Sequence, residues 1–173
     1  ELWSGRGGEE AKPWKANLLT RLIESGRYDL ARDTWARFTG ITADQDRLFD
    51  PDFSKQALPP FGWSLTSGSA GVAESEGGGR LHILFYGRDN VALASQVLTL
   101  KPGRYRLSMV ANFAVSTTSD SLQWTVSCLP ASKQIFSFRL DFVGPASNSF
   151  SVPPSNCRAQ RLELSGTAPE FAE

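Results

Sequence analysis

The chain has 173 residues, and its 18 lysine and arginine residues balance its 18 aspartate and glutamate residues. A neutral chain of this length suits one domain with an appendage and lacks the strong field that attracts nucleic acid. We therefore expect no nucleic-acid partner. No apolar run approaches the about 20 residues that cross a bilayer, so we expect no membrane span either.

Two short amphipathic helices are predicted within residues 1–40. Pro13 suits a first helical position, and the leucines and the isoleucine that follow it recur at helical spacing until Gly26. A second apolar stripe covers residues 28–38. Because a glycine at the end of a helix is a common left-handed cap, the two helices are expected to form a helical hairpin.

The sequence Leu22-x-x-x-Gly26-Arg27-Tyr28-x-x-Ala31 resembles part of a tetratricopeptide repeat. Such repeats are helix pairs that stack on further copies, and one copy cannot form a solenoid. Two interpretations stay open. The hairpin is a lid that packs on the rest of the chain, or it is the last repeat of a helical array and contacts a protein partner.

Residues 41–60 are predicted to be a connector, because the periodic pattern gives way there to Asp, Gln and Pro. Residues 61–173 show short alternating segments spaced by about ten residues, which is typical of an all-β sandwich. The predicted strands cover residues 61–65, 71–74, 81–86, 91–100, 104–113, 122–128, 134–142, 150–152 and 158–164.

The clearest alternation lies on both sides of Lys101-Pro102-Gly103. Proline fixes its own φ and glycine accepts positive φ, so this tripeptide predicts a tight turn. The flanking strands are therefore expected to pair as an antiparallel hairpin that needs a second apolar layer. By the same alternation, Trp63 and Trp124 are expected inside the sandwich and not on its surface.

Cys128 and Cys157 each fall at the end of a predicted strand, where a cross-link is sterically plausible. We expect a disulfide between them, which would indicate an oxidising compartment. The alternative is a pair of free, buried thiols.

The stretch Gln96-x-Leu98-x-Leu100-x-Pro102-Gly103-x-Tyr105-x-Leu107-Ser108 resembles the central hairpin of jelly-roll carbohydrate-binding modules, which are galactose-binding-like sandwiches. Upstream, Phe49-Asp50-Pro51-Asp52-Phe53 is similar to the opening strand of that family, and Gly62-Trp63 matches a feature that often follows it. The resemblance implies a mainly β fold, a jelly-roll β-sandwich behind the helical hairpin, with an opening strand from residue 48. It also implies a non-catalytic module of an exported envelope protein, periplasmic or extracellular, that binds a polysaccharide or another glycan.

The sequence offers few catalytic groups. His82 is the only histidine, and it lies in the middle of a predicted strand. Without a second base, neither a serine nor a cysteine nucleophile can be assembled around it. We therefore do not expect an enzyme. The rival to glycan binding is a structural protein–protein interaction module in a larger assembly.

A sugar site needs an exposed aromatic ring flanked by planar polar groups. Tyr86 points away from the core position Phe85, and the polar side chains of its own loop and of the outward side of a later strand complete a candidate site. The candidate residues are Tyr86, Arg88, Asn90, Arg106 and Asn112. A competing expectation is that the helical hairpin covers Tyr86 and Leu84, which would favour an interaction scaffold.

Asp50 and Asp52 lie in the motif that resembles the opening strand. Modules of that family often bind a structural calcium ion near this strand, so the resemblance implies a weak calcium site here. Calcium needs six to eight oxygen ligands, and only two carboxylates are at hand. The alternative is that both aspartates form a turn around Pro51. No other cofactor is expected.

Overall fold

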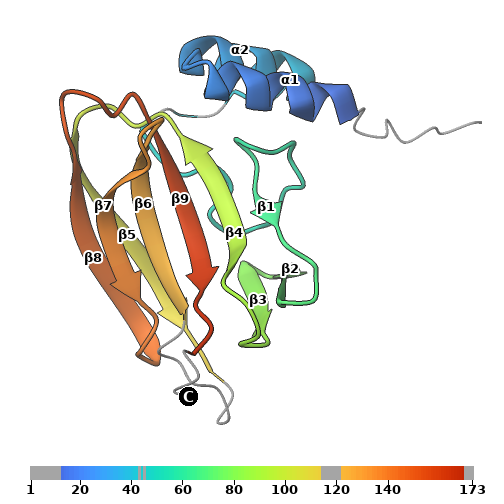
Figure 1. Cartoon of the computed structure of the whole chain (residues 1–173), viewed down its shortest axis with the longest axis vertical. Coiled ribbons are helices and arrows are strands. Elements are labelled where there is room, and N and C mark those ends of the chain that lie inside the picture. The colour runs from blue at the N-terminus through green and yellow to red at the C-terminus, as the bar shows by residue number, and fades with distance from the viewer. Residues whose placement is uncertain (1–12, 43, 45, 114–121, 170–173) are drawn as a thin grey trace, which may run out of the picture.

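The computed structural model describes residues 13–42, 44, 46–113 and 122–169. It is mainly β, with two helices followed by antiparallel strands (Figure 1), so the predicted β-sandwich with an N-terminal helical hairpin is confirmed. The elements are α1 (Pro13–Glu24), α2 (Tyr28–Thr39), β1 (Ser64–Leu65), β2 (Gly71–Gly77), β3 (Arg80–Phe85), β4 (Val91–Leu98), β5 (Gly103–Ala111), β6 (Leu122–Leu129), β7 (Lys133–Arg139), β8 (Gly144–Val152) and β9 (Ala159–Gly166). Neither described helix has the length and apolar content that crossing a membrane requires.

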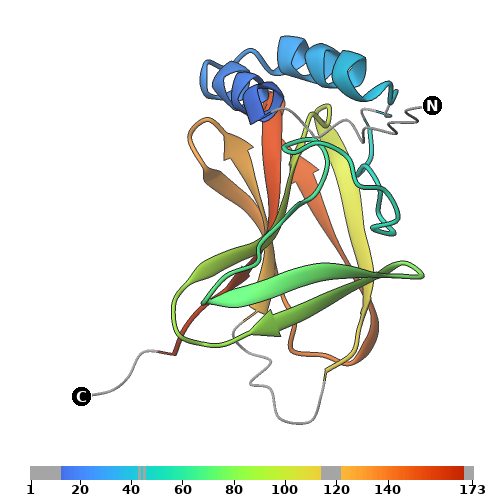
Figure 2. The same cartoon turned by 90° about the vertical axis from the view of Figure 1, so that its right-hand side faces the viewer.

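The strands form one five-stranded sheet and two ribbons. The sheet has the order β1-β4-β9-β6-β7, while β2 pairs with β3 and β5 pairs with β8. Figure 2 shows the β5–β8 ribbon on the side of the core opposite the sheet, and the β2–β3 hairpin crossing one side of the sandwich. Side chains from all three groups of strands pack in one apolar core.

The central hairpin expected across Lys101-Pro102-Gly103 is wrong. β4 pairs with β1 and β9, whereas β5 pairs with β8 over its whole length. Both strands turn apolar side chains toward the same core, but they do so from opposite layers. The link between them therefore crosses from one layer to the other, because two strands that face each other across a core cannot also be neighbours in one sheet.

Several element boundaries also differ from the predicted ones, and the differences at β8 and at residue 48 matter most. β8 is much longer than the predicted segment 150–152. Its first six residues have the sequence GPASNS, which carries no apolar alternation, so the pattern predicted only the end of the strand. No strand begins at residue 48. Asp50 and Phe53 have φ values of 51° and 52° there, which a strand cannot contain, so this segment forms turns instead.

The interior matches the alternation in the sequence. Trp63 and Trp124 are 9% and 8% exposed and lie 6.0 Å apart between ring centroids, so both are core residues as predicted. The neighbouring strands contribute Val126, Phe136, Leu162 and Leu164, all buried in the same cluster. Burial on this scale stabilises the sandwich at about 25 cal/mol per Å² of apolar surface removed from water.

The helical hairpin covers one end of the sandwich. Its buried side chains pack on Val97, Leu129 and Ala159, which come from the adjacent ends of β4, β6 and β9. Trp35 of α2 is central to this second cluster. It is 1% exposed, its ring contacts Phe49 and Phe61, and its Nε1 donates a hydrogen bond of 2.6 Å to the Leu58 carbonyl oxygen.

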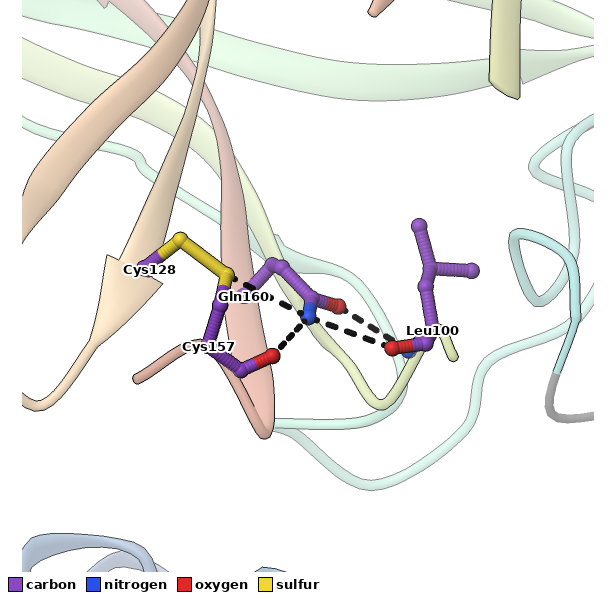
Figure 3. Close-up of a disulfide and its surroundings, with 4 residues drawn as sticks. All are labelled: Leu100, Cys128, Cys157 and Gln160. Atoms are coloured by element: carbon purple, nitrogen blue, oxygen red, sulfur yellow. Dashed lines mark hydrogen bonds between the residues drawn. A yellow bond between two sulfur atoms is a disulfide. The ribbon is translucent and has the colours of Figure 1, made fainter. Parts of the chain in front are cut away.

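The expected disulfide is present. Cys128 at the end of β6 and Cys157 just before β9 are bonded through sulfur atoms 2.03 Å apart (Figure 3). Both residues are buried, at 2% and 4% exposed. The bridge joins the strand that ends in Leu129 to the loop that leads back into its neighbour β9.

Replacing both cysteines, in the variant Cys128→Ala/Cys157→Ala, should lower the free energy of unfolding. The bond closes a loop with a sequence separation of 29, which the chain-entropy model values at about 3–4 kcal/mol. Guanidinium titration of the variant and of the oxidised parent measures the difference. If the native protein, alkylated without reductant, takes up label on both cysteines, the disulfide is absent.

Trp35→Ala should destabilise the protein by about 3–5 kcal/mol, because it removes a buried ring and leaves the Leu58 carbonyl without its donor. Trp14→Ala is the matched control. Trp14 lies on α1 but is 52% exposed and packs edge-to-face on Phe38, so its loss should cost about 0.5–1.5 kcal/mol, clearly less than the loss of Trp35. Equal denaturation midpoints for the two variants would contradict the docking of the hairpin on the sandwich.

Candidate functional site

The outward face of the β2–β3 hairpin is open to solvent. Cross-strand pairing places Leu84 opposite Val72, and His82 opposite Glu74, on this face. Leu84 is 44% exposed and Tyr86, directly after β3, is 49% exposed. Figure 2 shows the helices at the end of the sandwich, away from this hairpin.

The expectation that the helical hairpin covers Leu84 and Tyr86 is therefore wrong. The apolar stripes of the helices are already buried against the strand ends and against Phe61. Trp35 fits there because Phe49 and Leu58 of the segment that follows α2 complete its surroundings.

Tyr86, Arg88 and Asn90 lie together on the loop between β3 and β4. The loop is anchored at both ends. The Tyr86 backbone N–H donates to the Ala70 carbonyl oxygen over 3.1 Å, and the Ala168 N–H donates to Asn90 Oδ1 over 2.8 Å. Within the described part of the chain only the side-chain oxygen of Asn90 has a partner, so its amide nitrogen is available as a donor.

Arg106 and Asn112 do not join this loop. Arg106 lies on β5 opposite Ser149 of β8, and Asn112 follows the end of β5, both exposed. The five candidate residues are thus divided between two surfaces that belong to different ribbons. The second surface also contains Arg104, which was not proposed from the sequence although it shares the outward parity of Arg106.

His82 sits in an acidic environment on the open face. Its Nδ1 lies 3.3 Å from Glu74 Oε1 and 3.5 Å from Glu76 Oε1, and the imidazole is 39% exposed. The residues that the structure describes contain no group of three or more His, Cys, Asp or Glu side chains arranged to hold a metal ion. The imidazole and its carboxylates therefore form a solvated cluster on the hairpin.

Asp50 and Asp52 organise a turn. Asp50 is 5% exposed; its Oδ1 accepts the Ser54 N–H at 3.0 Å, and its Oδ2 accepts the Lys55 N–H at 3.0 Å. The Ser54 hydroxyl also donates to Asp52 Oδ1 over 3.0 Å, which lowers the pKa of the Asp52 carboxyl. Both residues line a hollow of about 240 Å³ beside the connector. These bonds match the turn interpretation of the two aspartates.

No family model, no curated protein and no solved structure matches the chain. Its function has to be argued from the surfaces themselves.

Asp50→Asn should lower the free energy of unfolding by about 1–3 kcal/mol, because the Ser54 and Lys55 N–H groups lose a charged acceptor that is itself buried. The loss should be the same in EDTA and in millimolar calcium, measured by thermal melting. Asp52→Asn, at an exposed position of the same turn, is the control and should melt close to the parent. A calcium-dependent rise in the melting temperature of the parent, absent from Asp50→Asn, would instead assign a calcium site to this turn.

Proposed function

We propose that the chain is a non-catalytic carbohydrate-binding module that holds a glycan against the open face around Tyr86. The observation that supports this best is the half-exposed ring of Tyr86 beside exposed Leu84. Arg88 and Asn90 follow on the same loop, are exposed, and carry planar polar groups. No cofactor is part of this proposal.

The physical basis is the two-sided character of a sugar ring. Its C–H face packs on an aromatic ring or an aliphatic side chain, and its hydroxyls need donors and acceptors at the rim. The backbone beneath Tyr86 is held by the inward side chains of β3, Leu81, Ile83 and Phe85, which pack on the sandwich core. A ring on a rigid support loses little freedom on binding, which favours affinity.

An exported setting fits this function. Disulfides persist in oxidising compartments and are rare in reducing ones, and the Cys128–Cys157 bond closes the sandwich next to β9. We therefore place the module in the periplasm or outside the cell, as part of an envelope protein.

A structural protein–protein interaction module is the second candidate. The helical hairpin carries large apolar side chains on its solvent side: Trp14 at 52%, Leu18 at 38% and Leu30 at 45% exposed. Helix pairs of the tetratricopeptide kind stack through such surfaces. In this alternative the hairpin, and not the Tyr86 face, binds a partner protein.

Tyr86→Ala should weaken glycan binding by about tenfold, because a stacked ring contributes about 1 kcal/mol beyond its buried area. A broad glycan array finds the ligand, and titration calorimetry on the best hit compares the variant with the parent. Trp14→Ala, which removes an equally exposed ring from the helical hairpin, is the matched control and should bind like the parent.

A parent protein that binds no glycan on the array would refute the proposed function. A loss of glycan affinity in Trp14→Ala with none in Tyr86→Ala would contradict the Tyr86 site and move the glycan site to the helical hairpin.

A further inference from the structure

The outer face of the β5–β8 ribbon is a second open surface. Tyr105, Leu107 and Met109 of β5 turn inward and pack on the core. The alternate residues therefore turn outward. Cross-strand register sets them in four exposed pairs, Arg104 with Ser151, Arg106 with Ser149, Ser108 with Ser147 and Val110 with Pro145.

This surface is positively charged although the whole chain is neutral. β5 and β8 contain two arginines and no aspartate or glutamate. Both arginines are exposed, and neither guanidinium has a hydrogen bond or an ion pair among the residues that the structure describes. As far as the described residues go, the donors of both guanidinium groups thus stay available to a ligand.

The surface is also regular. β5 and β8 pair from Gly103 to Ala111 without a shift of register, whereas the β2–β3, β4–β9 and β6–β7 pairs each contain an irregularity. Successive outward residues on a strand are about 6.6 Å apart. The two guanidinium groups and the row of serine hydroxyls beside them can thus contact several units of an extended polymer.

We infer that the outer face of the β5–β8 ribbon binds a polysaccharide that carries carboxylates, that is, one built from uronic acid units. This inference goes beyond the proposed function, because it adds a second glycan-binding surface on a different ribbon from Tyr86 and names the ligand class of that surface. The planar fork of arginine matches a carboxylate with two parallel hydrogen bonds. A uronate keeps its ring hydroxyls, which the serine hydroxyls can meet as donors and acceptors, whereas a sulfate ester replaces a hydroxyl.

Other anionic partners fit the same face less well. Binding of single-stranded nucleic acid uses aromatic side chains on which bases stack, and the outward positions of β5 and β8 contain none. Recruitment to an anionic membrane needs a cluster of about 4–8 basic residues, and this ribbon has two.

The test compares two polymers that differ in charge and not in sugar ring. Affinity electrophoresis and calorimetry measure the affinity of the full chain for polygalacturonate and for its fully methyl-esterified form. The parent should bind the free acid more tightly, and Arg104→Gln/Arg106→Gln should reduce binding to the acid by about tenfold or more while leaving binding to the ester unchanged. Arg21→Gln/Arg37→Gln, which removes the same charge from exposed positions of the helices, is the matched control and should bind like the parent.

Equal affinity of the parent for the acid and the ester would overturn the inference while leaving the proposed function standing. Equal losses of affinity for the acid in the two double-arginine variants would also overturn it, because they would report net charge alone. The same holds if the parent binds dextran sulfate or a single-stranded oligonucleotide as tightly as it binds polygalacturonate. Binding to neither pectin form, nor to any glycan on an array, would refute the proposed function as well.

Discussion

Two buried glutamines fasten irregular segments to the central sheet. Gln96 on β4 is 1% exposed; its Oε1 accepts the Phe49 N–H at 3.1 Å, and its Nε2 donates to the Phe49 carbonyl at 3.0 Å. Gln160 on β9, fully buried, does the same for Leu100 over 2.9 and 3.3 Å, and also donates to the Cys157 carbonyl over 2.7 Å (Figure 3). A buried backbone group without a partner costs about 1–3 kcal/mol. Each glutamine amide supplies the hydrogen bonds that a neighbouring strand would otherwise give to the backbone of Phe49 or Leu100.

The crossing from the sheet to the β5–β8 ribbon and the docking of the helices both depend on these hydrogen bonds. Leu100 lies in the link that carries the chain from β4 in the sheet to β5 in the opposite ribbon, and Gln160 holds that link beside the disulfide. Phe49 contacts Trp35, so the segment that Gln96 holds is also the surface on which α2 docks. Replacing either glutamine by an apolar residue would therefore loosen a connection between layers, and not only a local turn.

The sequence predicted the faces of strands better than their partners. Alternation correctly assigned Trp63 and Trp124 to the core, because parity alone determines which side of a strand a residue occupies. Parity does not say which strand lies alongside, so β4 was paired with β5 instead of β9. The serine-rich start of β8 has no apolar pattern, and the glutamine contacts join residues 47 and 60 positions apart, which no local pattern reveals.

The same limit applies to the candidate site, where parity predicted the faces of residues but not which residues lie together. Outward parity identified Tyr86 and Arg106, but the sequence could not show that they lie on different ribbons. The apolar stripes of the helices also do not predict which surface the helices pack on, since a stripe indicates that a helix face is buried but not against what. At the strand ends, Val97, Leu129 and Phe61 form one buried cluster with the helices, whereas Leu84 on the β2–β3 face stays 44% exposed. Because the hairpin closes an end of the sandwich, the broad faces of the ribbons stay open, and binding by strands does not require the helices to move.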